Sequence, residues 1–279
     1  MGARHVRYAC VTMDVEPDIG SKDARIELFQ SKPKLDRFAR IVNERRIPIT
    51  AFVATRLLAE APRIIDGARA ALPMRFEVHS HRHDQAEPDS EREIDASLEA
   101  YLRFFEAPPR GYRAPNGLIT ADGLRCLASR GFAYDSSIFP SVRFDEYGYS
   151  NLSYPIEPFV HQTPAELLEI PIGVIRGIRL VTCMSYIKLL GLPFYDAMMA
   201  LFGVPDILVF LVHPYDFTMP SHLHRIRGWK RHAHRRNADH AEELFFAFIE
   251  RLRRRGYRLV YMDQLLEKLE VDSLMRRAV

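Results

Sequence analysis

Cysteine is scarce in this sequence, and its few positions exclude two common kinds of site. The chain has three cysteines, Cys10, Cys126 and Cys183, an odd number at wide and unrelated spacings. Such spacing excludes a disulfide framework and a thiolate metal site. It favours a protein of a reducing compartment.

Long hydrophobic runs are also missing. The most apolar stretch, residues 180–212, is interrupted by Lys188, Asp196 and Asp206, so no charge-free run is long enough to cross a bilayer. The N-terminal residues lack the apolar segment that a secretion signal needs. From these two absences we expect a cytoplasmic protein, with contact at the inner membrane face left open.

A large excess of one charge is absent too. Lysine and arginine together number 39, and aspartate and glutamate number 36, which gives a net charge of +3. This balance is too mild for a dedicated nucleic-acid-binding protein, and the single tryptophan offers little surface for base stacking. Nucleic acid is therefore not an expected partner.

The 279 residues instead show short β-branched or aromatic runs that alternate with longer amphipathic runs, a pattern typical of repeated βα units. The expected strands are residues 7–13, 49–54, 75–78, 111–113, 132–135, 168–172, 207–212 and 258–261. The expected helices are residues 33–46, 55–71 with Pro62 as a candidate break, 89–106, 120–130, 239–255 and 264–269, besides a mostly helical excursion between the strands at 168–172 and 207–212.

No internal repeat is visible, so one domain over residues 1–279 is the simplest organisation, with a motif-bearing core at about 7–216 and a βα completion at 238–270. Seven or eight parallel strands with outer helices predict a closed or nearly closed α/β barrel. Residues 136–167 follow neither pattern, and we expect them to form a long loop over the site.

In such a barrel, catalytic side chains belong where the strands end. Polar residues follow five of the expected strands: Asp14 and Glu16, His79 with His81 and His83, Arg113, Asp135, and His213. The histidine group is the sharpest feature, because two imidazoles and one carboxylate leave a divalent metal an open position for water or substrate. A solvated, idle polar loop explains the same histidines equally well.

The Asp14-x-Glu16 pair allows one carboxylate to bind metal while the other acts as a general base. Arg113 is a candidate to keep the base ionised, and Asp135 is a candidate to do the same for a histidine. His213 is a candidate acid for a leaving amine, although a buried histidine at a strand end is more often a core residue. Ordinary ion pairs and helix caps are the alternatives for the other groups.

Taken in order, five segments resemble the five motifs of the polysaccharide deacetylase family, the carbohydrate esterases with a NodB homology domain. The segments are Thr12-Met-Asp-Val-Glu16, His79-Ser-x-x-His83, Arg113-x-Pro115, Asp135-Ser-Ser137 and Leu211-x-His-Pro214. Five ordered motifs are far more specific than any one of them, and the resemblance runs from about residue 7 to residue 216. The segment 134–140, together with 213–216, is particularly similar to the branch of the family found with exopolysaccharide synthesis.

The resemblance implies a distorted (β/α) barrel that removes N-acetyl or N-formyl groups from an amino sugar of a glycan, or of a lipid-linked or nucleotide-linked precursor. It also implies a divalent metal, with zinc as the first choice and cobalt, manganese or nickel as alternatives. The implied roles are Asp14 as general base, His213 as general acid, Arg113 as partner of the base, Asp135 as partner of His213, and Glu16, His79 and His83 as metal ligands.

One departure from the family concerns the carboxylate ligand. The commonest family pattern has two adjacent aspartates, of which the second binds metal, whereas Val15 stands at that position here. A spaced acidic pair also occurs in the family, so Glu16 is the candidate ligand and Asp18 is the fallback.

The histidine register is also open. An ungapped count places the family's two histidines at His81 and Gln85, and glutamine replaces an imidazole poorly as a ligand. A register on His79 and His83 preserves both ligands, and we prefer it.

The segment His222–Arg236 holds six basic residues and four histidines without an acid. It fits contact with the phosphates of a lipid-linked sugar or with an anionic membrane surface, and a solvated basic loop fits it equally well. Two other functions stay open: a non-catalytic carbohydrate-binding barrel that has lost its metal, and a metal-dependent phosphate-ester hydrolase. The sequence does not indicate an oligomeric state.

Overall fold

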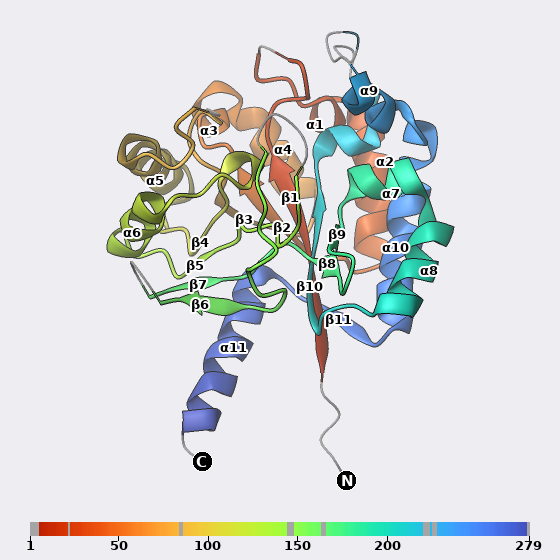
Figure 1. Ribbon diagram of the computed structural model, residues 1–279. Helices are drawn as coiled ribbons and strands as arrows, with labels where there is room; N and C mark the ends of the chain where they lie inside the picture. Colours follow the sequence, from red (N-terminus) through yellow and green to blue (C-terminus); the bar gives the residue numbers. More distant parts are fainter. Residues whose placement is uncertain are drawn as a thin grey trace.

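The computed structural model describes residues 6–21, 23–83, 86–143, 148–162, 166–219, 224 and 228–277. Its centre is a nine-stranded sheet in the order β10-β1-β2-β3-β4-β5-β7-β6, with β11 paired to β1 (Figure 1). The strands are β1 (Arg7–Val15), β2 (Ile49–Val53), β3 (Met74–Val78), β4 (Gly111–Tyr112), β5 (Tyr134–Asp135), β6 (Phe159–His161), β7 (Leu167–Glu169), β10 (Ile207–Val212) and β11 (Tyr257–Leu259).

The sheet is parallel except for β6, which pairs antiparallel with β7. The strand ladder is open between β7 and β10. A backbone hydrogen bond from Gly173 N to Val209 O, at 2.9 Å, crosses this gap. The predicted distorted barrel of parallel strands is therefore confirmed, with one antiparallel strand added inside the expected loop 136–167.

Helices cover the outside of the sheet, and Figure 1 shows α5 and α6 on one side and α2, α7, α8 and α10 on the other. The helices are α1 (Glu27–Gln30), α2 (Lys32–Glu44), α3 (Leu57–Glu60), α4 (Pro62–Ala71), α5 (Glu91–Phe105), α6 (Ala121–Ser129), α7 (Met184–Leu190), α8 (Leu192–Phe202), α9 (Gly228–Arg235), α10 (Ala241–Arg254) and α11 (Met262–Arg277). A hairpin of β8 (Val174–Ile175) and β9 (Leu180–Val181) precedes α7. Across the described residues, every helix is too short or too polar to span a membrane.

Alternate residues of β1 face two different hydrophobic cores, as the two-residue period of a strand requires. Ala9, Val11 and Met13 pack with the outer helices, whereas Cys10 packs inside the barrel. The first residues of α11, including Leu265, also belong to the inner core and help to fill the interior of the barrel. Continuing the same alternation, Thr12 and the residues two and four positions later point into the barrel at its carboxyl end.

The gap between β7 and β10 gives a test of the fold. A Cβ on Gly173 would lie 2.6 Å from Thr182 Oγ1 and 2.7 Å from the backbone oxygen of Val209, so Gly173→Ala is expected to lower the free energy of unfolding by about 1–3 kcal/mol. Gly67→Ala in α4 meets no atom within 4 Å and is expected to raise it by up to about 1 kcal/mol. Urea unfolding of both variants measures the difference, and equal effects would contradict the packing described for the gap.

Candidate active site

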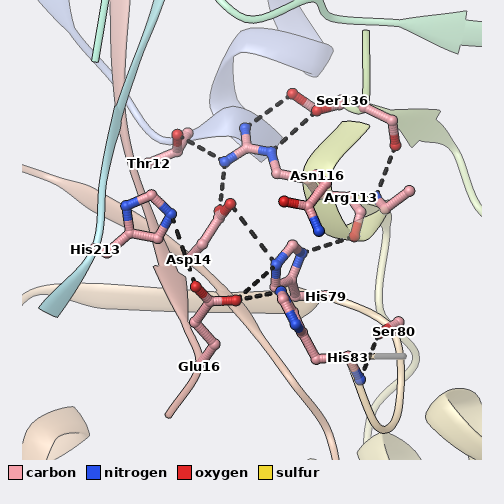
Figure 2. A network of polar contacts seen from close by, with 12 residues as sticks. Thr12, Asp14, Glu16, His79, Ser80, His83, Arg113, Asn116, Ser136 and His213 are labelled. Atoms are coloured by element: carbon pink, nitrogen blue, oxygen red, sulfur yellow. Dashed lines mark hydrogen bonds and ion pairs between the residues drawn. The ribbon is translucent and has the colours of Figure 1, made fainter. Parts of the chain in front are cut away.

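The polar side chains at the strand ends meet in one cavity of about 870 Å³ at the end of the barrel to which β1 points. Four strands position them: Asp14 lies in β1 and Glu16 directly follows it, His79 and His83 follow β3, Arg113 follows β4 and His213 follows β10. Figure 2 shows these side chains turned toward one another. Residues of the expected loop, among them Phe139, Val142 and Tyr149, also line the cavity.

Glu16, His79 and His83 form the only group among the described residues whose ligand atoms could hold a metal ion, all within 4.8 Å of one another. The Oε2 atom of Glu16 is buried and accepts no hydrogen bond, yet it lies 3.6 Å from His79 Nε2 and in contact with His83 Nε2 (Figure 2). Burial opposes ionisation of Glu16, but the adjacent His83 outweighs it and holds the pKa of Glu16 well below its usual range. An ionised, unsatisfied carboxylate oxygen beside two imidazoles fits a divalent cation.

The tautomer of His79 also suits a metal ligand. Its Nδ1 lies 2.8 Å from the backbone oxygen of Arg113, which can only accept, so the proton sits on Nδ1. The Nε2 lone pair is then free to face Glu16. A backbone carbonyl that fixes the ring in this way is the usual outer partner of a metal-bound histidine.

The loop after β3 is held in an uncommon conformation that lets both rings face Glu16. Ser80 and His83 have φ values of 55° and 60°, in the left-handed region that costs a residue with a Cβ roughly 1 kcal/mol. Hydrogen bonds offset this cost: His83 N donates to Ser80 Oγ, and Glu93 Oε2 accepts from the backbone of His81. Strain of this kind typically persists at functional sites.

The structure brings together one of the alternative ligand sets left open by the sequence. His81 turns away from Glu16, with its Nδ1 3.0 Å from Thr55 Oγ1, and Gln85 lies outside the described residues. Asp18 Oδ2 accepts from the backbone nitrogen of Glu27, and Asp18 is not part of the cluster. The fallback ligand therefore serves the turn before α1.

Asp14 and Arg113 form a buried ion pair beside the cluster. Arg113 Nη1 donates to Asp14 Oδ1 at 2.7 Å and to Thr12 Oγ1 at 3.0 Å, while Nε and Nη2 donate to Ser136 at 3.0 Å (Figure 2). The guanidinium also lies over the Phe52 ring, 4.0 Å from its centre. All of these contacts hold Asp14 in one orientation, with Oδ2 3.8 Å from His79 Nε2.

His213 lies across the cavity from this pair, and its partner is not the expected one. Its Nδ1 lies 3.3 Å from Asp216 Oδ2, and its backbone nitrogen donates to the same oxygen at 2.8 Å. The assignment of Asp135 to His213 is wrong, because Asp216 occupies the ring nitrogen from the turn that follows β10. Burial alone would lower the pKa of His213, but Asp216 and the carboxylates of Glu16 and Asp14 raise it to about 9.

Three further residues at this side of the cavity were missed by the sequence reasoning. Tyr215 donates to Glu16 Oε1 at 2.9 Å and stacks on the His213 ring with centres 4.6 Å apart. Lys188 is completely buried, with Nζ 3.7 Å from Asp216 Oδ1. Only the spacing of Asp216, three residues after His213, offered a signal, since a carboxylate there can bond back to the strand end.

Asp135 is buried one layer below the cavity, away from His213. Its carboxylate accepts from Ser137 Oγ at 2.6 Å and lies opposite Glu169 on the neighbouring strand. Burial raises the pKa of Asp135 well above its ordinary range, and the adjacent Glu169 charge raises it further. Burial likewise raises the pKa of Glu169 to about 7, against the backbone hydrogen bond from Ile138. Both carboxyl groups are therefore held toward their protonated forms.

This buried acid pair predicts a pH dependence of stability. The pKa of Glu169 is raised in the folded protein. Its contribution to the free energy of unfolding is therefore present at low pH and is lost as the pH rises from about 4.5 to about 7. The loss is about 3 kcal/mol for the whole interval. Glu169→Gln is expected to flatten the fall in unfolding free energy between pH 5 and pH 8, measured by urea unfolding. Glu99→Gln, at an exposed position on α5, serves as the control and should leave the slope unchanged.

The basic segment His222–Arg236 lies only partly within the described residues. In its described part, His234 of α9 lines the cavity and meets the Tyr215 ring edge-on, with ring centres 5.6 Å apart. Burial lowers the pKa of His234 to about 4, so this imidazole is neutral. Arg231, Arg235 and Arg236 are exposed, and no contact with a phosphate or a membrane follows from their exposure alone.

The comparisons with known proteins concern the sequence pattern and the fold. Residues 12–134 match the sequence model of the family described as polysaccharide deacetylase, whereas the comparison with curated protein sequences gave no match. Solved structures with the same fold include a protein from Mycobacterium smegmatis named as a putative polysaccharide deacetylase, at 17% identity and a TM-score of 0.60. That alignment covers 98% of this chain and 94% of the other.

Two other solved structures show how far this fold extends. The allantoinase Puue aligns with a TM-score of 0.56 at 13% identity, over 95% of this chain and 90% of its own. A CE4 family pseudoenzyme from Bacillus anthracis aligns with a TM-score of 0.51 at 14% identity, over 94% of this chain and 66% of its own. At such identities the likeness concerns the fold. The predicted resemblance is confirmed: residues 12–134 carry the polysaccharide deacetylase sequence pattern on a deacetylase-like (β/α) barrel.

Proposed function

We propose that this protein is a metal-dependent hydrolase that removes an N-acetyl or N-formyl group from an amino sugar. One observation carries the proposal: the ligand cluster of Glu16, His79 and His83 shares a cavity with a fixed carboxylate, Asp14, on one side and His213 on the other. An amide needs a base for the attacking water and an acid for the leaving nitrogen, and this cavity offers both on opposite sides.

The ligand cluster would hold the metal through Glu16 Oε2 and the Nε2 atoms of His79 and His83. The fit rests on the buried, unbonded Oε2 atom and on the fixed tautomer of His79. When bound, a divalent metal supplies polarisation of the amide carbonyl and makes a water molecule more acidic. Two imidazoles and a carboxylate suit zinc, with cobalt, manganese and nickel as alternatives.

The chain's own residues perform the proton transfers. Asp14 Oδ2 takes the proton of the attacking water, while Arg113 holds Oδ1 and keeps the carboxylate aimed. His213 Nε2 gives a proton to the departing sugar nitrogen, and Asp216 holds the protonated ring through Nδ1. The reaction needs no covalent intermediate, so the buried serines Ser136 and Ser137 serve Arg113 and Asp135 rather than attack.

The cavity suits a sugar with an anionic group. Its volume of about 870 Å³ falls in the range of about 300–1,000 Å³ that is usual for small-molecule sites. Arg56, Arg82 and Arg143 line it in addition to Arg113. Guanidinium groups bind phosphate well, so a nucleotide-linked or lipid-linked amino sugar is the substrate class that we propose.

The proposal is tested by metal content and by the acid released. The purified protein is expected to bind about one divalent ion per chain and to release acetate or formate from an acylated amino sugar. His79→Ala and His83→Ala should each lower the affinity for the metal by at least about 10-fold, so that the ion and most of the activity are lost.

His81→Ala is the matched control, because it changes the same loop without touching the ligand cluster. It should keep the ion. Release of inorganic phosphate instead of acetate or formate would indicate a phosphate-ester hydrolase. A protein that binds the sugar but binds no metal and releases no acid would be a non-catalytic carbohydrate-binding barrel.

A further inference from the structure

Helix α8 has an exposed face without polar side chains. Its sequence, Leu-Pro-Phe-Tyr-Asp-Ala-Met-Met-Ala-Leu-Phe, is apolar around nearly the whole helix, yet one face is not covered. Phe194 is 41% exposed and Leu201 is 71% exposed, and the seven-residue spacing places them on one stripe with Ala197 between them. Helices that are apolar all round are normally buried, so this stripe requires an explanation.

Neighbouring segments extend the apolar surface. Leu190, at the end of α7, and Ile178, in the turn of the β8–β9 hairpin, are exposed large hydrophobic residues. The hairpin turn lies against α8, because a Cβ on Gly177 would be 2.9 Å from the Phe202 ring, and Phe202 is itself partly exposed. Figure 1 shows α8 at the outer edge of the molecule, beside α7 and α10.

Arginines border this apolar surface. A cavity of about 250 Å³ between α8 and α10 is lined by Asp196, Arg251, Arg254 and Arg255. Asp196 is the one acid of α8, and Arg251 Nε bonds both of its oxygens, at 2.7 and 3.0 Å. Among the described residues, neither Arg254 nor Arg255 makes an ion pair with an acid; Arg254 Nε donates to the backbone oxygen of Glu250 at 3.4 Å, which leaves its terminal nitrogens for an anion.

We propose that α8 docks on an anionic phospholipid surface, with Phe194 and Leu201 entering the acyl region and Arg254 and Arg255 binding lipid phosphates. An apolar helix face with cationic groups at its border is the usual feature of proteins that lie in a membrane interface. The charge of the border selects lipid over an apolar protein partner, because Asp196 is already paired with Arg251, and the two remaining guanidinium groups suit a phosphate layer. The inference does not depend on the proposed reaction, and it uses residues other than the basic segment His222–Arg236.

The test is sedimentation of the full-length protein with vesicles of phosphatidylcholine, with and without about a third of phosphatidylglycerol. Binding is expected only with the anionic lipid, and salt should weaken it. Leu201→Gln with Phe194→Gln should weaken binding about tenfold or more, and Arg254→Gln with Arg255→Gln should do likewise.

Matched controls separate the site from general effects. Val160→Gln, at a position that is 52% exposed on the edge strand β6, removes an exposed apolar residue elsewhere. Arg40→Gln with Arg103→Gln removes two charges on α2 and α5. Both controls should bind as the unchanged protein does, and thermal unfolding checks that all variants are folded.

Two results would overturn the inference. One is equal vesicle binding by the α8 variants and the controls, or no binding to anionic vesicles at all. The other is a dimer in solution, seen by light scattering, that Leu201→Gln dissociates, because a second copy of the chain would then cover the stripe.

Discussion

Asp14→Asn is expected to lower kcat/KM on an acylated amino sugar by about 10²–10⁴-fold, the usual contribution of a positioned general base. Asparagine keeps the shape of the side chain and can still accept from Arg113 Nη1 through its oxygen. It cannot take a proton from water at Oδ2. Acetate or formate release measures the loss, with metal content measured on the same preparation to show that the ligand cluster is intact.

Asp18→Asn is the matched control for this result. Asp18 lies four residues later on the same strand-end segment and lines the same cavity, but its carboxylate holds the backbone of Glu27. Its loss should change kcat/KM by less than about threefold, in keeping with a residue outside the proton transfers. If Asp14→Asn stayed within this small range, the assignment of the base would be wrong.

Lys188→Met is expected to destabilise the protein by about 3–5 kcal/mol, because it removes one of the two cationic groups, Lys188 and His213, that face the buried Asp216 carboxylate. The ammonium group also donates to the backbone oxygen of Asp216 at 3.2 Å, and Ser185 donates to the carboxylate at 3.1 Å. Methionine fills a similar volume, so the loss reports the charge rather than a cavity.

A double-mutant cycle isolates the pair. Asp216→Asn alone should also destabilise, since Lys188 would then be buried without a counter-charge. Combining both changes should recover about 1–3 kcal/mol relative to the sum of the single losses, measured by urea unfolding. Simple additivity would show that the two groups are not energetically coupled.

The sequence allowed most of the architecture to be predicted, because the pattern that defines a buried parallel strand is local. The strand at 207–212 was predicted to the residue, since six consecutive apolar residues are needed where both faces of a strand are covered. Pro62 marked the boundary between α3 and α4 for an equally local reason, since proline starts a helix and cannot continue one. The strand-end polar residues followed from the same periodicity.

The errors arose where the outcome depends on tertiary contacts. Asp135 and Asp216 are both acids at strand ends, and only the packing of α7 and the turn after β10 decides which of them meets His213. Lys188 interrupted an apolar run in the sequence, which gave no sign that it would be buried against an acid. Strand β6 is three residues long and gains its place by pairing with β7, so no pattern of its own marks it.

The beginning of α11 has a consequence for how the products of the proposed reaction would leave. Met262, Leu265 and Leu266 are buried under the barrel and, together with Cys10 and Phe52, form an apolar floor beneath the polar cluster. A small carboxylate such as acetate would have to shed its hydration to pass through that floor. We therefore expect the cavity to have a single opening, through which the sugar enters and the freed acid leaves. A deacylated sugar that stays bound would then block release of the acid.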